Sequence, residues 1–73
     1  MEITREVVER NILKTQECLE KAYGDKFDKR KFLIKRLVVA LRSSIAARNN
    51  DDFDTQKWYL LEEKIITDML NKL

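Results

Sequence analysis

Basic side chains gather in the middle of this chain, and Lys and Arg at such density are the residue types that bind phosphate or carboxylate groups. Residues 26–48 contain eight Lys and Arg residues and a single acid, Asp28, so their net charge is +7. The flanking segments, residues 1–25 and 49–73, have net charges of −2 and −3, and the +2 of the whole chain conceals this division. A segment of this kind must either meet its counter-charge inside the molecule or present it to an anionic partner.

Residue types that support catalysis are missing. The chain has no histidine to act as a base near neutral pH, no glycine-rich phosphate loop and no pairing of Ser or Cys with His. We therefore predict that the protein is not an enzyme and needs no cofactor.

Metal binding is also disfavoured. Asp51, Asp52 and Asp54 alternate in part like calcium ligands, but the segment lacks the glycine turn and the distal glutamate of a calcium loop. These acids are better explained by the N-terminus of a helix, where negative charge is favourable. The single cysteine, Cys18, cannot form an internal disulfide and is expected to be a small core residue on the first helix.

Length and composition indicate one small folded domain over residues 1–73. A chain of 73 residues with 44% hydrophobic residues can fold, but its core is small, so self-association is a reasonable expectation. We expect no membrane segment, because the longest apolar run covers only residues 37–41, and the lone cysteine favours the cytoplasm. Abundant Lys, Ile, Asn and Asp suggest an AT-rich source such as a phage or a low-GC bacterium.

The elements that position these side chains are predicted to be three helices. Proline is absent and Gly24 is the only glycine, which is typical of long helices joined by short turns. Periodicity and capping residues place the helices at about 4–23, 28–48 and 53–72. Asp25 or Asp28 would cap the second helix, and the Asn49–Asn50 pair would adopt the left-handed conformation that ends it. The fold class is all-α, an antiparallel up-down-up three-helix bundle.

The core is predicted from the large apolar residues that recur at helical spacing. On the second helix they form one main stripe, made of Ile34, Leu37, Val38, Leu41 and Ile45. The centre of the bundle is expected to contain Leu19, Ile34, Leu37, Leu41, Trp58, Ile65 and Met69. Tyr23 and Tyr59 are expected at the core with polar tips.

A second apolar stripe, Phe32, Val39 and Ala46, lies nearly opposite the first on the second helix and has basic borders. It could pack inside the bundle against another helix. It could instead be exposed, and a cation-rimmed apolar stripe fits a docking surface for a protein partner or a second copy of the chain. The predicted partner-binding residues are Phe32, Val39, Lys31, Lys35, Arg36 and Arg42.

Nucleic-acid binding is the alternative function. The residues that could contact phosphates are Lys29, Arg30, Lys31, Lys35, Arg36 and Arg42. The second helix has few amide side chains for reading bases, so backbone recognition fits better than base readout. Protein binding is preferred, because acids on the neighbouring helices weaken the basic field.

Glu62 falls inside the apolar face of the third helix, where an unpaired carboxylate would be costly. We predict an arginine from another helix as its ion-pair partner, with Arg10, Arg30 and Arg48 as candidates. Such a pair would specify the alignment of the helices, the alternative being a functional carboxylate.

Overall fold

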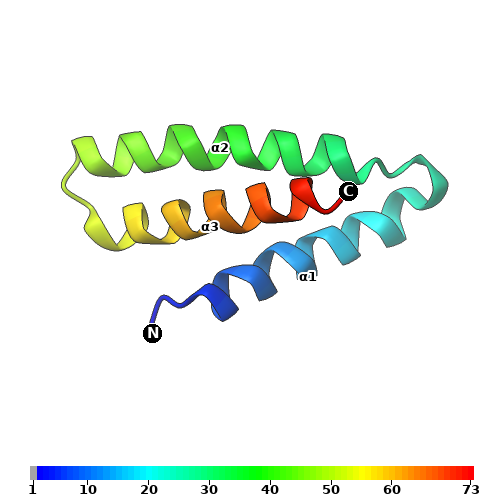
Figure 1. Ribbon diagram of the computed structural model, residues 1–73, viewed down its shortest axis with the longest axis horizontal. Helices are drawn as coiled ribbons and strands as arrows, with labels where there is room; N and C mark the ends of the chain where they lie inside the picture. The colour runs from blue at the N-terminus through cyan, green and yellow to red at the C-terminus, as the bar shows by residue number, and fades with distance from the viewer. Residues whose placement is uncertain (1) are drawn as a thin grey trace.

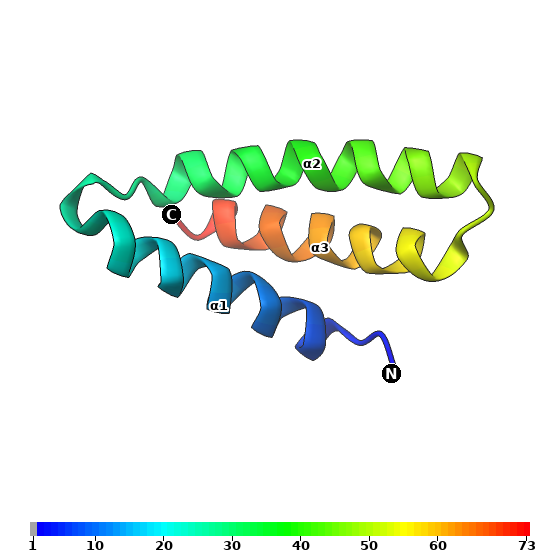
Figure 2. The same cartoon turned by 180° about the vertical axis from the view of Figure 1, so that it is seen from behind.

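Three helices make up the computed structural model, which describes residues 2–73 (Figure 1). Helix α1 covers Arg5–Tyr23, α2 covers Lys29–Asn49 and α3 covers Phe53–Asn71, and a short 3-10 turn at Gly24–Lys26 follows α1. Helices α2 and α3 run side by side in opposite directions, and α1 lies obliquely against α3 (Figures 1 and 2). The prediction of an all-α, up-down-up three-helix bundle is confirmed.

The helix ends lie where capping residues occur in the sequence. The side chains of Thr4, Asp28 and Asp52 accept hydrogen bonds from backbone amides in the first turns of α1, α2 and α3. The hydroxyl of Thr55 also donates to Asp52, and these bonds hold the pKa of Asp52 below its ordinary value.

Two residues with positive φ make the chain reversals. Gly24 ends α1 with φ 55°, a conformation in which glycine has no Cβ to clash. The residue that adopts positive φ after α2 is Asp51, also at 55°, and the expectation of Asn49 or Asn50 was wrong. Helix α2 continues to Asn49, and Asn50 caps it with negative φ.

A small core joins all three helices. Its fully buried side chains are Val8, Ile12, Leu33, Ile65 and Ile66. Of the residues predicted at the centre, Ile65 is buried, while Leu19, Leu37, Trp58 and Met69 are half-buried. None of the three helices has the length and apolar composition needed to cross a lipid bilayer, within the described residues.

The predicted inward face of α2 was wrong. Ile34 and Leu41 were expected at the centre of the bundle, but they lie at the surface together with Val38 and Ile45. The inward side chains instead form a seam of two leucines and three small residues: Leu33, Leu37, Ala40, Ser44 and Ala47. Small side chains let two helices approach more closely than large ones do, so α3 packs on this side.

Helix α1 also differs from the prediction at its C-terminal end. Cys18 is exposed, not a core residue, because it lies about 100° around the helix from its inward neighbour Leu19. Tyr23 is exposed as well, since the chain leaves the bundle there to make the turn.

Candidate partner-binding groove

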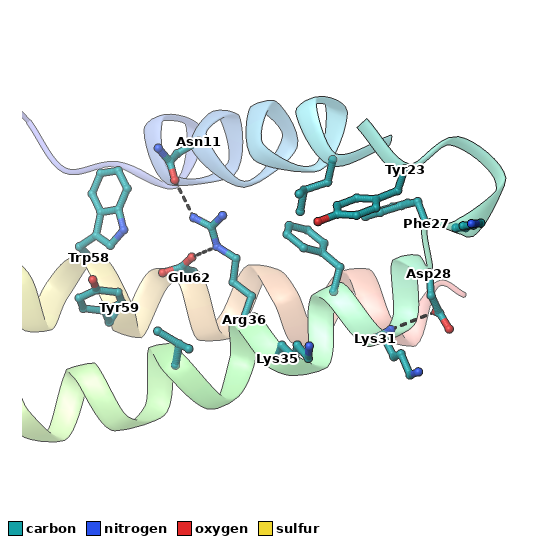
Figure 3. A pocket seen from close by; sticks show the side chains of 14 residues that line it. Asn11, Tyr23, Phe27, Asp28, Lys31, Lys35, Arg36, Trp58, Tyr59 and Glu62 are labelled. Atoms are coloured by element: carbon teal, nitrogen blue, oxygen red, sulfur yellow. Dashed lines mark hydrogen bonds and ion pairs between the residues drawn. The ribbon is translucent and has the colours of Figure 1, made fainter. Parts of the chain in front are cut away.

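A groove of about 650 Å³ lies between α1, the turn that follows it and the side of α2 that faces α1 (Figure 3). Residues from α3 close one end. We call it the aromatic groove, because its walls include Tyr23, Phe27, Phe32, Trp58 and Tyr59. Its volume is within the range of sites that hold small ligands or a few side chains of a partner.

The aromatic side chains come from separate parts of the chain. Phe27 follows the 3-10 turn and Phe32 lies in the first turn of α2, so that their ring centroids are 5.8 Å apart at an angle of 50°. Trp58 and Tyr59 approach from α3 and are half-buried. Phe32 is also half-buried and packs against the core, so it supports the fold and lines the groove at once.

Three lysines line the groove with free charges. Lys26, Lys31 and Lys35 are exposed and have no ion-pair partner among residues 2–73. The acids of the groove are already engaged, because the Asp28 carboxylate accepts a hydrogen bond from the backbone amide of Lys31 and Glu62 is paired with Arg36. The lining has four basic and two acidic side chains, so the groove presents a net charge of +2 beside an apolar wall.

A polar triad links the three helices at the inner side of the groove (Figure 3). Arg36 of α2 donates from Nε to the buried carboxylate of Glu62 on α3, and from Nη2 to Oδ1 of Asn11 on α1 at 2.6 Å. Glu62 is only 2% exposed, so this ion pair satisfies a carboxylate that has almost no access to water.

The prediction that Glu62 pairs with an arginine of another helix is confirmed, but the partner is Arg36. The candidates Arg10, Arg30 and Arg48 are wrong. Arg30 and Arg48 followed from the wrong inward face of α2, since the observed rotation turns Arg36 inward and leaves these two exposed. Arg10 of α1 is exposed as well.

The predicted partner-binding residues mostly come together. Five of the six line the aromatic groove, namely Phe32, Val39, Lys31, Lys35 and Arg36. Arg42 is exposed further along α2 and is not part of the lining, and neither are the predicted phosphate contacts Lys29 and Arg30. Sequence reasoning missed Asn11 and Phe27, and it assigned Tyr23, Trp58 and Tyr59 to the core. A phenylalanine placed just before a capping aspartate, as Phe27 is, was the available signal for an aromatic at the turn.

The charge of residues 26–48 is not neutralised inside the molecule. Within the described residues, the ion pairs are Arg5–Asp68, Lys21–Glu17 and Arg36–Glu62. Seven of the eight basic residues in the segment therefore have no acidic partner and lie exposed: Lys26, Lys29, Arg30, Lys31, Lys35, Arg42 and Arg48.

No family model matches this chain, and no curated protein or solved structure is significantly similar to it.

Proposed function

We propose that this protein is a non-enzymatic binding module, a small cytoplasmic regulator or accessory protein that receives an acidic, partly apolar segment of a protein partner in the aromatic groove. The observation that carries the proposal is the position of three unpaired lysines beside an aromatic wall. Aromatic residues are enriched at protein interfaces, where they bury a large area with few rotatable bonds.

Charge and preorganisation support this occupant. Carboxylates of a partner would pair with Lys26, Lys31 and Lys35, while its apolar side chains would cover Phe27 and Val39. Arg36 is already held by Asn11 and Glu62, so the inner wall needs little reordering on binding.

Single-stranded nucleic acid is a second candidate, and the same groove supports it. Proteins that bind single strands combine a basic channel with aromatic rings on which bases stack. We rank it second because α1 presents exposed acids, Glu6, Glu17 and Glu20 among them, that repel phosphates.

Trp58 offers a direct test, because it is the only tryptophan and lines the groove. The probe is a 12-residue peptide in which Asp and Glu alternate with Leu and Phe, and its counterpart with Lys in place of the acids. We expect the acidic peptide to change the Trp58 emission in a saturable way and the basic peptide to have no effect.

The groove variant is Lys31→Gln, Lys35→Gln and Val39→Ser, which changes exposed side chains and spares Phe32. It should weaken the acidic peptide at least tenfold, because it removes two charges and an apolar contact. The matched control is Lys57→Gln, Leu60→Ser and Lys64→Gln on the outer side of α3, which should leave the dissociation constant within about twofold.

The same variants separate the two candidates. If a dT12 oligonucleotide binds and the peptide does not, with a log-affinity versus log-salt slope that falls by about 0.7 per lost lysine, nucleic acid is the ligand and the protein-binding proposal is wrong. Equal affinities of the groove variant and its control for both probes would overturn the groove as a site.

A further inference from the structure

Helix α2 carries a second apolar surface, whose apolar residues are not part of the groove. Ile34, Val38, Leu41 and Ile45 are 47%, 41%, 39% and 60% exposed, although all four are large aliphatic residues. We call them the apolar strip. Their spacing of four, three and four residues keeps them in one line along about 16 Å of helix, and this is the spacing with which one helix packs against another.

The strip and the groove lie on opposite sides of α2. Phe32 of the groove and Ile34 of the strip are two residues apart, which separates them by about 160° around the helix. The strip therefore faces away from α1, on the side of the α2–α3 pair that α1 does not cover.

Cations border the strip on both edges. At about 100° per residue, Lys31, Lys35 and Arg42 follow one edge, and Arg30 and Arg48 lie at the other. All five are exposed and without an ion-pair partner in residues 2–73. Helix α2 itself contains no acid, so nothing on it offsets this charge.

The charges decide against a second copy as the occupant. The four-three-four spacing reads the same in both directions, so a second α2 could align its apolar strip antiparallel to the first. The same alignment would bring Lys35 of each copy close to Arg42 of the other, and Arg30 close to Arg48. Like charges along a helix interface repel, so this antiparallel pairing of two copies is unfavourable.

We infer that the apolar strip binds an acidic amphipathic α-helix of another protein. Its apolar residues would recur at alternating spacings of three and four and cover Ile34, Val38, Leu41 and Ile45. Its Asp and Glu side chains would flank that seam and pair with the five bordering cations. The bound helix lies along α2 as a fourth helix, opposite α1, and does not cover the aromatic wall of the groove.

The test uses a fluorescein-labelled 22-residue peptide with Ile and Leu at alternating three- and four-residue spacings, Glu at the flanking positions, and Ala and Gln elsewhere. Its counterpart has Lys in place of Glu. Fluorescence anisotropy at nanomolar peptide measures binding to the protein. We expect the Glu peptide to bind at least tenfold more tightly than the Lys peptide, and to weaken as salt is raised.

Two double variants form a matched pair. Val38→Ser with Ile45→Ser removes half of the strip, whereas Leu13→Ser with Leu60→Ser changes two comparably exposed aliphatic residues, on α1 and α3, that belong neither to the strip nor to the groove. We expect the first variant to weaken the Glu peptide at least tenfold and the second to stay within about twofold. Circular dichroism should show unchanged helix content in both.

Three results would overturn the inference. The first is equal binding of the Glu peptide to both variants. The second is a dimer in sedimentation that Val38→Ser with Ile45→Ser abolishes, since a second copy would then occupy the strip. The third is strip-dependent binding to vesicles of equal phosphatidylglycerol and phosphatidylcholine without binding of the Glu peptide. The groove and the strip share Lys31 and Lys35, but Val38→Ser with Ile45→Ser changes no residue of the groove, so a loss of binding in this variant reports on the strip alone.

Discussion

The two sides of α2 carry apolar patterns with the same spacing, yet one is covered and the other is not. The covered side is the seam that begins at Leu33 and continues through small residues such as Ala40 and Ala47. The uncovered side is the apolar strip, which begins one residue later at Ile34. Both follow alternating steps of four and three residues, so periodicity alone does not distinguish them.

The difference between the two patterns is side-chain size. The small residues of the seam let α3 pack closely on α2, and the one buried hydroxyl there, of Ser44, is satisfied by donating to the Leu41 carbonyl at 2.9 Å. In this small bundle the face with the largest apolar residues is therefore not the inward face of the helix. The larger residues remain at the surface, where they are free to meet another molecule.

The strongest test of the covered side is Arg36→Met. This change leaves the Glu62 carboxylate buried without its ion-pair partner, which should lower the free energy of unfolding by about 3 to 5 kcal/mol. Urea unfolding followed by circular dichroism measures the effect. A loss below about 1 kcal/mol would show that Glu62 gains access to water or a new partner.

The companion variants sharpen this prediction. Glu62→Leu should cost much less than Arg36→Met, because the Arg36 side chain is 19% exposed and can turn its guanidinium to water. The double variant Arg36→Met with Glu62→Leu should be neutral or stabilising if the pair serves only to align the helices. A double variant as unstable as Arg36→Met alone would contradict that role.

The next largest contrast is between two leucines on the two sides of α2. Leu33→Ala should cost about 2 to 5 kcal/mol, because Leu33 is fully buried in the core. Leu41→Ala makes the same chemical change on the uncovered side and should cost less than about 1 kcal/mol. Comparable losses for the two, measured by urea unfolding, would mean that the strip is covered in solution.

The sequence was sufficient to predict the helices and their order. Their boundaries depend on local interactions, such as the Asp28 and Asp52 caps and the positive φ of Gly24, and such interactions act within a few residues. The pairing of Glu62 with an arginine was also predictable, because a carboxylate inside an apolar face requires a partner wherever it lies.

The rotation of α2 could not be obtained in this way, because it depends on how α3 fits against the whole helix. A prediction that gives most weight to large apolar residues selects Ile34 and Leu41 as the inward residues of α2. The observed packing instead turns Leu33, Ala40 and Ala47 inward. The same error hid the role of Arg36 and the separation of the strip from the groove. A run of small residues at alternating steps of four and three was the signal for the inward face, and it was present in the sequence.

The smallest expected effect concerns the ion pair that holds α1 against α3. Arg5 of α1 donates from Nη2 to Oδ2 of Asp68 on α3 at 2.8 Å, and this hydrogen bond lowers the pKa of Asp68. Both side chains are exposed, so Arg5→Gln should lower the urea midpoint only slightly, and less in 0.5 M salt than in dilute buffer.

The pH dependence of that small difference tests its origin. A carboxylate whose pKa is lowered by folding stabilises the protein above the pKa of an unfolded aspartate, about 3.9, and loses this contribution as the pH falls through the lower folded value. The difference between the original protein and Arg5→Gln should therefore be constant from about pH 7 to 5, begin to fall near the unfolded pKa and vanish only when the pH is below the lowered pKa of folded Asp68. The lowered pKa of Asp52 comes from Thr55 and is common to both proteins, so it cancels. A difference that persists at the lowest pH would mean that Arg5 holds α1 by packing of its aliphatic stem and not by its charge.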